Sequence, residues 1–172
     1  AFARAAFDLS ERFDTVVMMR TCTRIAHSQS IVELGERVAP PEKPYAKNPE
    51  KYIMMPAYAK KRHPIVEQRM ADLTKYAEKC PFNRVEPGTR TDLGIITSGT
   101  CYQYVKEVFG DTVPVLKLGM VNPLPPQLIR DFAAKVDRVA VIEELDETEI
   151  PVLLKTLRGL DTFFRSYSDV CH

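Results

Sequence analysis

Closely spaced cysteines are absent from this 172-residue sequence, and so is tryptophan. The cysteines are Cys22, Cys80, Cys101 and Cys171, so the CxxC spacing typical of zinc sites and iron–sulfur clusters does not occur. No run reaches the roughly 18 apolar residues of a membrane span, and residues 1–10 lack the apolar core of a signal peptide. We therefore expect a cytoplasmic location, free thiols, no metal site and no membrane partner.

An excess of one charge is also absent. The 24 Lys and Arg residues nearly balance the 23 Asp and Glu residues, which gives a formal net charge of +1. A dedicated nucleic-acid binder carries a basic excess, so we expect no nucleic-acid partner. Hydrophobic residues make up 45% of the 172 residues, enough for the core of one domain, alone or with part of a second.

Residues 1–38 have the pattern of one helix followed by one or two strands. Apolar positions in residues 5–13 follow helical spacing. Residues 15–20 form a continuous apolar run that ends in an arginine, which predicts a buried strand. Residues 21–30 are polar and predict a loop, and residues 31–34 predict a short second strand. Because so few elements cannot close a core, we expect residues 1–38 to be the C-terminal end of a domain whose beginning is missing.

Prolines are concentrated in residues 39–64, which hold six of the 13 in the sequence: Pro40, Pro41, Pro44, Pro49, Pro56 and Pro64. Proline removes a backbone donor and fixes φ, so we expect neither helix nor sheet here. Structureless stretches of this length are uncommon inside a compact domain. The segment is therefore predicted to be an interdomain linker that lies along a surface.

Helical and apolar segments alternate from residue 65 onward. The expected elements are a helix at 65–79, a strand at 92–97, a helix at 100–109, a strand at 113–120, a helix at 127–135, a strand at 138–142 and a helix at 147–157. Gly110 is placed to end the second helix and Pro126 to open the third. Buried strands separated by helices predict a three-layer α/β/α fold with a mainly parallel sheet. Six strand residues are expected to form one core: Ile95, Ile96, Val115, Leu116, Val141 and Ile142.

The turn Ser98-Gly99-Thr100 follows the first predicted strand of this region and opens a helix. Free backbone amides and the helix dipole favour an anion at such a point, at the end of the strand where open α/β sheets bind ligands. The alternative interpretation is structural: Ser98 or Thr100 caps the helix and Gly99 makes the turn. We favour the structural interpretation and keep the anion site as a candidate.

A second candidate site lies just after the predicted strand at residues 15–20. Its members are Arg20, Thr21, Thr23, Arg24, His27 and Ser28. Guanidinium groups bind carboxylates and phosphates in a bidentate manner, and histidine titrates near neutral pH. This stretch could therefore face an acidic substrate or a diphosphate, or it could be a solvated loop that bridges to a neighbouring domain.

Two clusters of like charge receive a structural interpretation. Residues 143–147 place four carboxylates at the end of the third predicted strand, where acidic residues commonly complement the dipole of a following helix; a metal site is the less favoured alternative. The basic tetrad at residues 60–63 is interpreted as a solvated part of the linker.

Several stretches together resemble one enzyme family. They are TVVMMRTCTRIAHS at 15–28, KYIMMPAYAKKRH at 51–63, DLGIITSGTCYQYVKEVF at 92–109, LKLGMVNPLP at 116–125 and VIEEL at 141–145. They are similar to segments of the large subunit of indolepyruvate:ferredoxin oxidoreductases. The family pattern has threonine at the place of Cys22 and often serine at the place of Ala26. The resemblance covers nearly the whole chain except residues 160–172.

The resemblance implies a parent enzyme that decarboxylates arylpyruvates oxidatively to aryl-acetyl-CoA. It implies thiamine diphosphate, Mg and 4Fe-4S clusters as cofactors, and CoA, ferredoxin, a smaller second subunit and other domains of the same subunit as partners. Residues 1–38 would end a thiamine pyrimidine-binding-type domain, 39–64 would be the linker, and 65–172 would be a transketolase C-terminal-domain-like α/β domain.

The sequence lacks the family's Gly-Asp-Gly metal motif and its cluster-binding cysteines. We therefore expect this chain to bind no cofactor itself, to hold no complete active site and to serve in assembly. Two alternatives stay open. The chain could be part of another thiamine-dependent enzyme, a pyruvate or 2-oxoglutarate oxidoreductase, or it could be a non-catalytic module that binds CoA or a partner.

Overall fold

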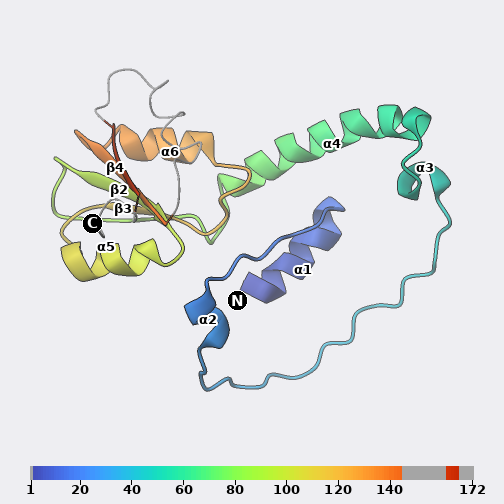
Figure 1. The fold of residues 1–172 in the computed structure, drawn as a ribbon, viewed down its shortest axis with the longest axis horizontal. Coiled ribbons are helices and arrows are strands. Elements are labelled where there is room, and N and C mark those ends of the chain that lie inside the picture. The colour runs from blue at the N-terminus through green and yellow to red at the C-terminus, as the bar shows by residue number, and fades with distance from the viewer. Residues whose placement is uncertain (1, 145–161, 167–172) are drawn as a thin grey trace. The chain divides into compact units, whose positions relative to one another are not determined.

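The computed structural model describes residues 2–144 and 162–166 of the chain (Figure 1). The chain divides into two compact units, residues 1–69 (unit 1) and residues 70–172 (unit 2). One helix, α4 (Pro56–Ala77), runs through the division. No helix in the described ranges is both long enough and apolar enough to cross a membrane.

Unit 2 is built on a five-stranded sheet with the strand order β1-β3-β2-β4-β5. The strands are β1 (Arg84–Glu86), β2 (Gly94–Ser98), β3 (Val115–Leu118), β4 (Val139–Glu143) and β5 (Thr162–Ser166). β2 pairs in parallel with β3 and β4, and β4 pairs in parallel with β5, whereas β1 runs antiparallel to β3. The predicted mainly parallel sheet is confirmed.

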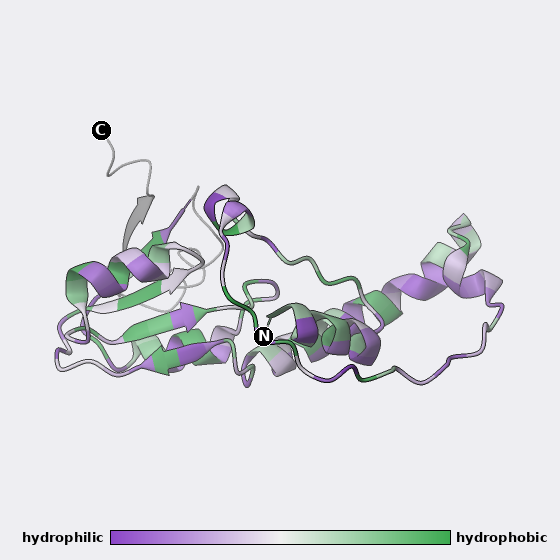
Figure 2. Ribbon diagram, turned by 90° about the horizontal axis from the view of Figure 1, so that it is seen from below, coloured by the Kyte–Doolittle hydropathy of each residue, from purple (hydrophilic) through white to green (hydrophobic). Residues whose placement is uncertain are grey.

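Two helices cover opposite faces of this sheet, α5 (Cys101–Phe109) and α6 (Pro126–Ala133) (Figure 1). Val105 of α5 lies in the core on one face, and Ile129 and Phe132 of α6 lie in the core on the other. The central strands between them consist mostly of hydrophobic residues (Figure 2). The three-layer α/β/α prediction is therefore confirmed, whereas the predicted helix at 147–157 lies outside the described residues.

The six strand residues expected to share one core are in fact divided between two. The α6 side receives Ile96, Leu116 and Val141, and the α5 side receives Ile95, Val115 and Ile142. Successive residues of a strand point to opposite faces of the sheet, so adjacent apolar residues contribute to different cores. Five of the six are 0–1% exposed, the exception being Ile142, which is only partly buried.

The helix ends of unit 2 follow the sequence signals. Gly110 ends α5 with φ of 56°, a value that favours glycine, and its N–H bonds the carbonyl of Lys106. Pro126 occupies the first turn of α6, where its missing N–H costs nothing. The edge strands β1 and β5 were not predicted. β1 has only three residues, two of them charged, which is too short to show a period.

Side chains that follow α4 hold the connection between β3 and α6. The buried Asn83 donates to the carbonyl of Ala77 at 3.0 Å and accepts from the N–H groups of Gly119 and Met120 at 2.9 and 2.8 Å. The Glu78 carboxylate accepts from the first free N–H groups of α6, at Gln127 and Leu128. An anion at a helix N-terminus is favourable, so the connection between β3 and α6 is held where it leaves β3 and where it enters α6.

Unit 1 consists of α1 (Phe2–Phe13), α2 (Thr23–His27), α3 (Pro49–Tyr52) and the first part of α4. The helix predicted at residues 5–13 is confirmed. The strands predicted at 15–20 and 31–34 are wrong: both segments are extended without strand pairing, and Val16 is 91% and Ile31 100% exposed. A strand needs a neighbour for its ladder, and among the described residues none pairs with them. The loop predicted at 21–30 contains the short helix α2.

The prediction that residues 39–64 hold neither helix nor sheet is also wrong. α3 begins at Pro49 and α4 at Pro56, because proline is compatible with the first turn, where no donor is needed. Asn48 caps α3 by accepting from the N–H of Lys51 at 3.1 Å. Pro64 lies inside α4, where it removes one ladder bond that the long helix tolerates.

Candidate functional site

The carboxyl ends of β2 and β4 form the candidate site of unit 2. These strands are neighbours, yet the chain continues from β2 to β3 on one side and from β4 to β5 on the other. Ligands of open α/β proteins bind where adjacent connections leave in opposite directions. The predicted turn Ser98-Gly99-Thr100 lies at this point, and Glu143 and Glu144 lie beside it at the end of β4.

Hydrogen bonds join the two strands at this edge. The Ser98 hydroxyl donates to Oε2 of Glu143 at 2.9 Å, and the Thr97 hydroxyl donates to the carbonyl of Ile142 at 2.8 Å. Glu143 is 8% exposed. The structure therefore places a buried carboxylate in direct contact with the predicted anion turn.

The capping interpretation of the turn is half right. Gly99 makes the turn with φ of 53°, a conformation that favours glycine. Neither hydroxyl caps α5, however, because Ser98 is bonded to Glu143 and Thr100 makes no side-chain capping bond. Thr100 itself has helical φ and ψ angles of −73° and −27°, which differ from the extended conformation of a capping residue.

The electrostatics of this edge are negative. Burial, together with the charges of Glu143 and Glu144, raises the pKa of the Cys101 thiol to about 11. A thiol with such a pKa stays protonated near neutral pH and is no nucleophile. The same carboxylates oppose an anion at Ser98-Gly99-Thr100. The hydroxyl and carboxylate pair at this edge suits a neutral or cationic hydrogen-bond donor better than it suits an anion. The anion site at Ser98-Gly99-Thr100 stays a prediction.

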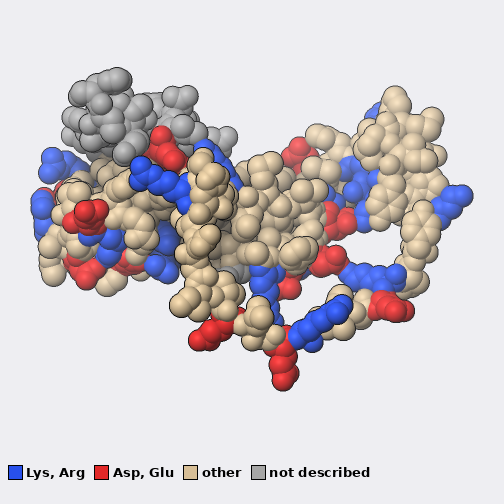
Figure 3. All heavy atoms as spheres, turned by 60° about the horizontal axis from the view of Figure 1, so that its bottom comes forward, with Lys and Arg blue, Asp and Glu red and all other residues tan. Residues whose placement is uncertain are grey.

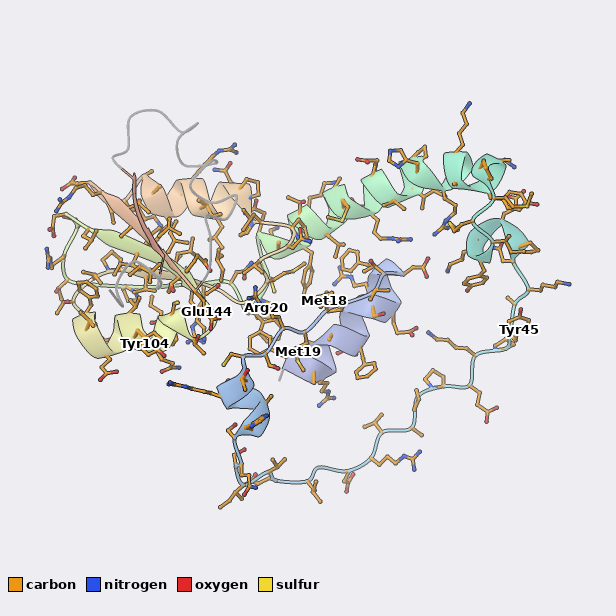
Figure 4. The ribbon with its side chains drawn as sticks, viewed as in Figure 1. Met18, Met19, Arg20, Tyr45, Tyr104 and Glu144 are labelled. Carbon is orange, nitrogen blue, oxygen red and sulfur yellow. The ribbon has the colours of Figure 1, made fainter. Side chains whose placement is uncertain are left out.

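The second candidate site, the arginine–threonine stretch at residues 20–28, lies in unit 1. It is exposed throughout, except for the partly buried Cys22. Met18, Met19 and Arg20 follow one another along the extended segment between α1 and α2 (Figure 4). α2 places Arg24 and His27 three residues apart on neighbouring positions of one helical face. The Ser28 hydroxyl donates to the carbonyl of Ile25 at 2.8 Å and ends the helix.

The predicted site residues thus fall into two groups. Thr23, Arg24 and His27 come together on α2, and Arg20 and Thr21 precede it. Ser98, Gly99 and Thr100 belong to unit 2. Within the described residues, no group of three or more His, Cys, Asp or Glu side chains is arranged to hold a metal ion.

Sequence reasoning missed a polar cluster on the α5 side of β1 and β3. Its members are Arg84, Glu86, Tyr102, Lys106 and Lys117. The Glu86 carboxylate accepts from the Tyr102 hydroxyl and from Nε of Arg84, both at 2.9 Å, and pairs with Lys106 at 3.3 Å. Burial alone would raise the pKa of Glu86, but these hydrogen bonds together lower it. The cluster could have been found only by recognising Arg84-Val85-Glu86 as a strand.

Charged side chains of both signs also occur outside this cluster. Lys and Arg side chains are interspersed with Asp and Glu side chains on the face that Figure 3 shows. In unit 1, Asp14 pairs with Lys51 at 2.6 Å and with Arg69 at 3.3 Å, which joins the end of α1 to α3 and α4. The hydrogen bond from Lys51 lowers the pKa of Asp14.

Comparison with known proteins gives a consistent set of relatives. The chain is 39% identical over 164 residues to the indolepyruvate oxidoreductase subunit IorA of Methanothermobacter marburgensis, which covers 91% of this chain and 26% of that protein. It is 36% identical over 153 residues to the subunit of the same name from Archaeoglobus fulgidus, covering 84% of this chain and 24% of that protein. The chain therefore spans about a quarter of the length of these curated relatives.

Two further comparisons complete these findings. No protein-family model matches the chain. A 2-oxoglutarate:ferredoxin oxidoreductase from Magnetococcus marinus, solved with 2-oxoglutarate, coenzyme A and succinyl-CoA bound, superposes with a TM-score of 0.47 at 17% identity, covering 66% of this chain and 20% of that one.

Proposed function

Because the chain is homologous over most of its length to part of the indolepyruvate oxidoreductase subunit IorA, we propose that it is one section of an enzyme that oxidises arylpyruvates. The parent enzyme would decarboxylate indolepyruvate and related 2-oxoacids to aryl-acetyl-CoA and pass the electrons to ferredoxin. The sequence similarity carries this proposal, since six subunits of the same name match at 34–39% identity.

Thiamine diphosphate would supply the decarboxylation chemistry of such a parent enzyme. The residues of this chain do not by themselves fit that cofactor. The sequence has no Gly-Asp-Gly motif, and the described carboxylates, histidines and cysteines form no group that could hold its metal ion. We therefore assign thiamine diphosphate, its Mg ion and the 4Fe-4S clusters to other parts of the parent enzyme, and we propose that this chain holds no complete active site.

Unit 2 would act in assembly as a transketolase C-terminal-like domain. Both faces of its central strands are covered by its own helices, with core residues 0–8% exposed, so it is built to be stable as a body. The proposed division is a pyrimidine-type domain end at 1–38, a linker at 39–64 and this domain at 65–172. The linker would retain that role although it contains helical turns.

Unit 1 would contribute residues to surfaces shared with other domains and with the second subunit. Its apolar segment at 15–20 is exposed here, and Arg20, Thr21, Thr23, Arg24, His27 and Ser28 follow directly. In this proposal the apolar segment is covered by the rest of its domain. The arginines would then face the substrate carboxylate or the diphosphate, as charged bidentate donors do.

The test uses the full-length parent protein with its second subunit. Reduction of ferredoxin would be measured with CoA and, in turn, indolepyruvate, phenylpyruvate, pyruvate and 2-oxoglutarate. The proposal predicts that both arylpyruvates are oxidised with higher kcat/KM than the two small acids. Preference for pyruvate or 2-oxoglutarate would instead assign the chain to another 2-oxoacid oxidoreductase. CoA binding without reduction on any substrate would identify a binding module.

A further inference from the structure

Two cations lie directly opposite each other on the α5 side of the sheet. Arg84 of β1 is the register partner of Lys117 of β3. Like charges at directly opposed positions of an antiparallel pair destabilise it. This pair therefore needs compensation from the groups around it.

Arg84 finds that compensation in its own strand and in α5. Its Nε donates to Glu86 at 2.9 Å and its Nη2 donates to the Tyr102 hydroxyl at 3.4 Å. Its side chain is nevertheless 54% exposed, so part of the guanidinium fork still faces solvent. Arg84 can therefore accept a further anionic partner without losing Glu86.

The positive charge of Lys117 is compensated much less than that of Arg84. It lies half-buried, with its ammonium 4.1 Å from the centroid of the Tyr102 ring. Within the described residues its ammonium group makes no hydrogen bond or ion pair. Burial and, after it, the charge of Arg84 lower the pKa of Lys117, and the opposing charge of Glu86 does not cancel this shift. An aromatic face offsets only part of the cost of a partly desolvated charge.

The carboxylates of the cluster are already engaged. Glu86 bonds Arg84, Tyr102 and Lys106, and Lys106 also pairs with Asp111. Three cations thus face two carboxylates. Arg84 and Lys117, which flank the same aromatic ring, are where an added negative charge would gain most.

We propose that Arg84 and Lys117 bind an oxyanion, the carboxylate or phosphate group of a ligand, beside the ring of Tyr102. A guanidinium fork and an ammonium group are the donors that proteins use for both groups. An oxyanion between them turns the repulsion of the pair into attraction. The competing explanation is that charge on β1 only keeps this edge strand from pairing with another chain, and it predicts no anion binding.

The test is an NMR titration of the ¹⁵N-labelled chain with inorganic phosphate and, separately, with acetate, at constant ionic strength held with sodium chloride. The expected result is saturable movement of the Tyr102 and Lys117 amide signals with a Kd on the order of millimolar, which a few charged hydrogen bonds provide. Tighter binding of phosphate would indicate a phosphate-bearing ligand, and tighter binding of acetate a carboxylate.

Three variants sharpen this test. Lys117→Met keeps the unbranched stem, Arg84→Gln keeps a polar fork, and each is expected to weaken binding by about tenfold or more. Lys135→Met removes an exposed lysine that follows α6 and should bind as wild type. Should Lys117→Met fail to fold, Lys117→Arg keeps the charge and should retain binding while Arg84→Gln loses it. No saturation in the wild type, or equal affinity in all proteins, overturns the proposal.

Discussion

Two apolar runs of this chain lie in opposite environments, one buried and the other exposed. In unit 2, Ile95 and Ile96 of β2 are 0% exposed, whereas in unit 1 Val16 and Met18 are 91% and 89% exposed. β2 has a parallel neighbour on each side and a helix against each face. The run at 15–20 has no ladder partner among the described residues. An apolar, β-branched run therefore becomes a buried strand only where other segments supply both the ladder and the cover.

The two units also differ as a whole in how far their side chains are buried. None of residues 2–69 is buried, although α1 has one apolar face. Ion pairs such as those of Asp14, whose side chain is 55% exposed, join the helices of unit 1, and solvent-exposed pairs contribute little stability. Unit 2 owes its stability to two closed cores. Core variants in unit 2 should thus change stability, whereas Arg24→Ala in unit 1 should change the activity proposed for the parent enzyme.

The largest effect is expected from Ile96→Ala. This variant empties part of the α6-side core between Leu116 and Val141 and should lower the free energy of unfolding by about 2–5 kcal/mol. Val16→Ala in unit 1 is the matched control and should stay within about 0.5 kcal/mol. Urea unfolding followed by circular dichroism measures both. An unchanged midpoint in Ile96→Ala would contradict the strand assignment.

Most of unit 2 could be predicted from the sequence because its signals agree with its environment. The run at 113–120 contains all of β3, the runs at 92–97 and 138–142 contain most of β2 and β4, and Gly110 and Pro126 mark helix ends. The division of the core follows from the strand period of two, which a continuous apolar run does not display. Strands β1 and β5 were not predicted, because an edge strand can be short and charged and need not contain a long apolar run.

The sequence predicts unit 1 less well, because the structure of its run at 15–20 and of its proline-rich segment depends on neighbouring residues that no local pattern specifies. A proline forbids the interior of a helix far more than its first turn, which explains α3 and the start of α4. For the candidate site, the sequence placed the turn at Ser98 correctly. The carboxylate of Glu143 beside it depends on a register between β2 and β4 that no local pattern specifies. The family prediction is confirmed by the relatives.

The second effect is a difference in thiol reactivity between the cysteines of the two units. Because burial and two carboxylates raise the pKa of Cys101 to about 11, its thiolate fraction at pH 8 should be about 100-fold below that of an ordinary thiol. Cys22 of unit 1 is only partly buried and should react with iodoacetamide before Cys101 does, as read by peptide mass spectrometry. Folded Cys101 keeps its proton longer than unfolded Cys101, so this thiol should also make stability fall between about pH 9 and pH 11. Equal labelling at pH 8 would contradict this assignment.

The third effect concerns catalysis rather than stability. In the full-length enzyme, Arg24→Ala should lower kcat/KM for indolepyruvate by about one to two orders of magnitude, as loss of a charged hydrogen bond worth roughly 1.5–3 kcal/mol does. Its melting temperature should not change, because Arg24 is exposed on α2. Arg37→Ala, on the exposed segment after α2, is the control and should be neutral. If Arg24→Ala lowers stability without a kinetic loss, the stretch bridges domains. If it changes neither, the stretch is a solvated connector.

The smallest difference is expected between the stability costs of two asparagine variants, one in each unit. Asn83 is 8% exposed and satisfies three backbone groups, the carbonyl of Ala77 and the N–H groups of Gly119 and Met120. Asn83→Ala leaves these groups without their partner and should cost about 1–3 kcal/mol. Asn48 is exposed and caps the four-residue helix α3 through one bond. Asn48→Ala should cost about 0.5–1 kcal/mol of local helix stability, and water replaces the lost bond.

The two asparagine variants are distinguished by where the change is seen. Hydrogen exchange should accelerate at Gly119 and Met120 in Asn83→Ala, because Asn83 ties the loop after β3 to the end of α4. In Asn48→Ala, faster exchange should stay within residues 48–53, and the unfolding midpoint of unit 2 should not move. Equal midpoints for the two variants would mean that Asn83 is replaced by water as readily as Asn48. In that case the contrast between a closed unit 2 and an open unit 1 would hold for the apolar core but not for the polar contacts.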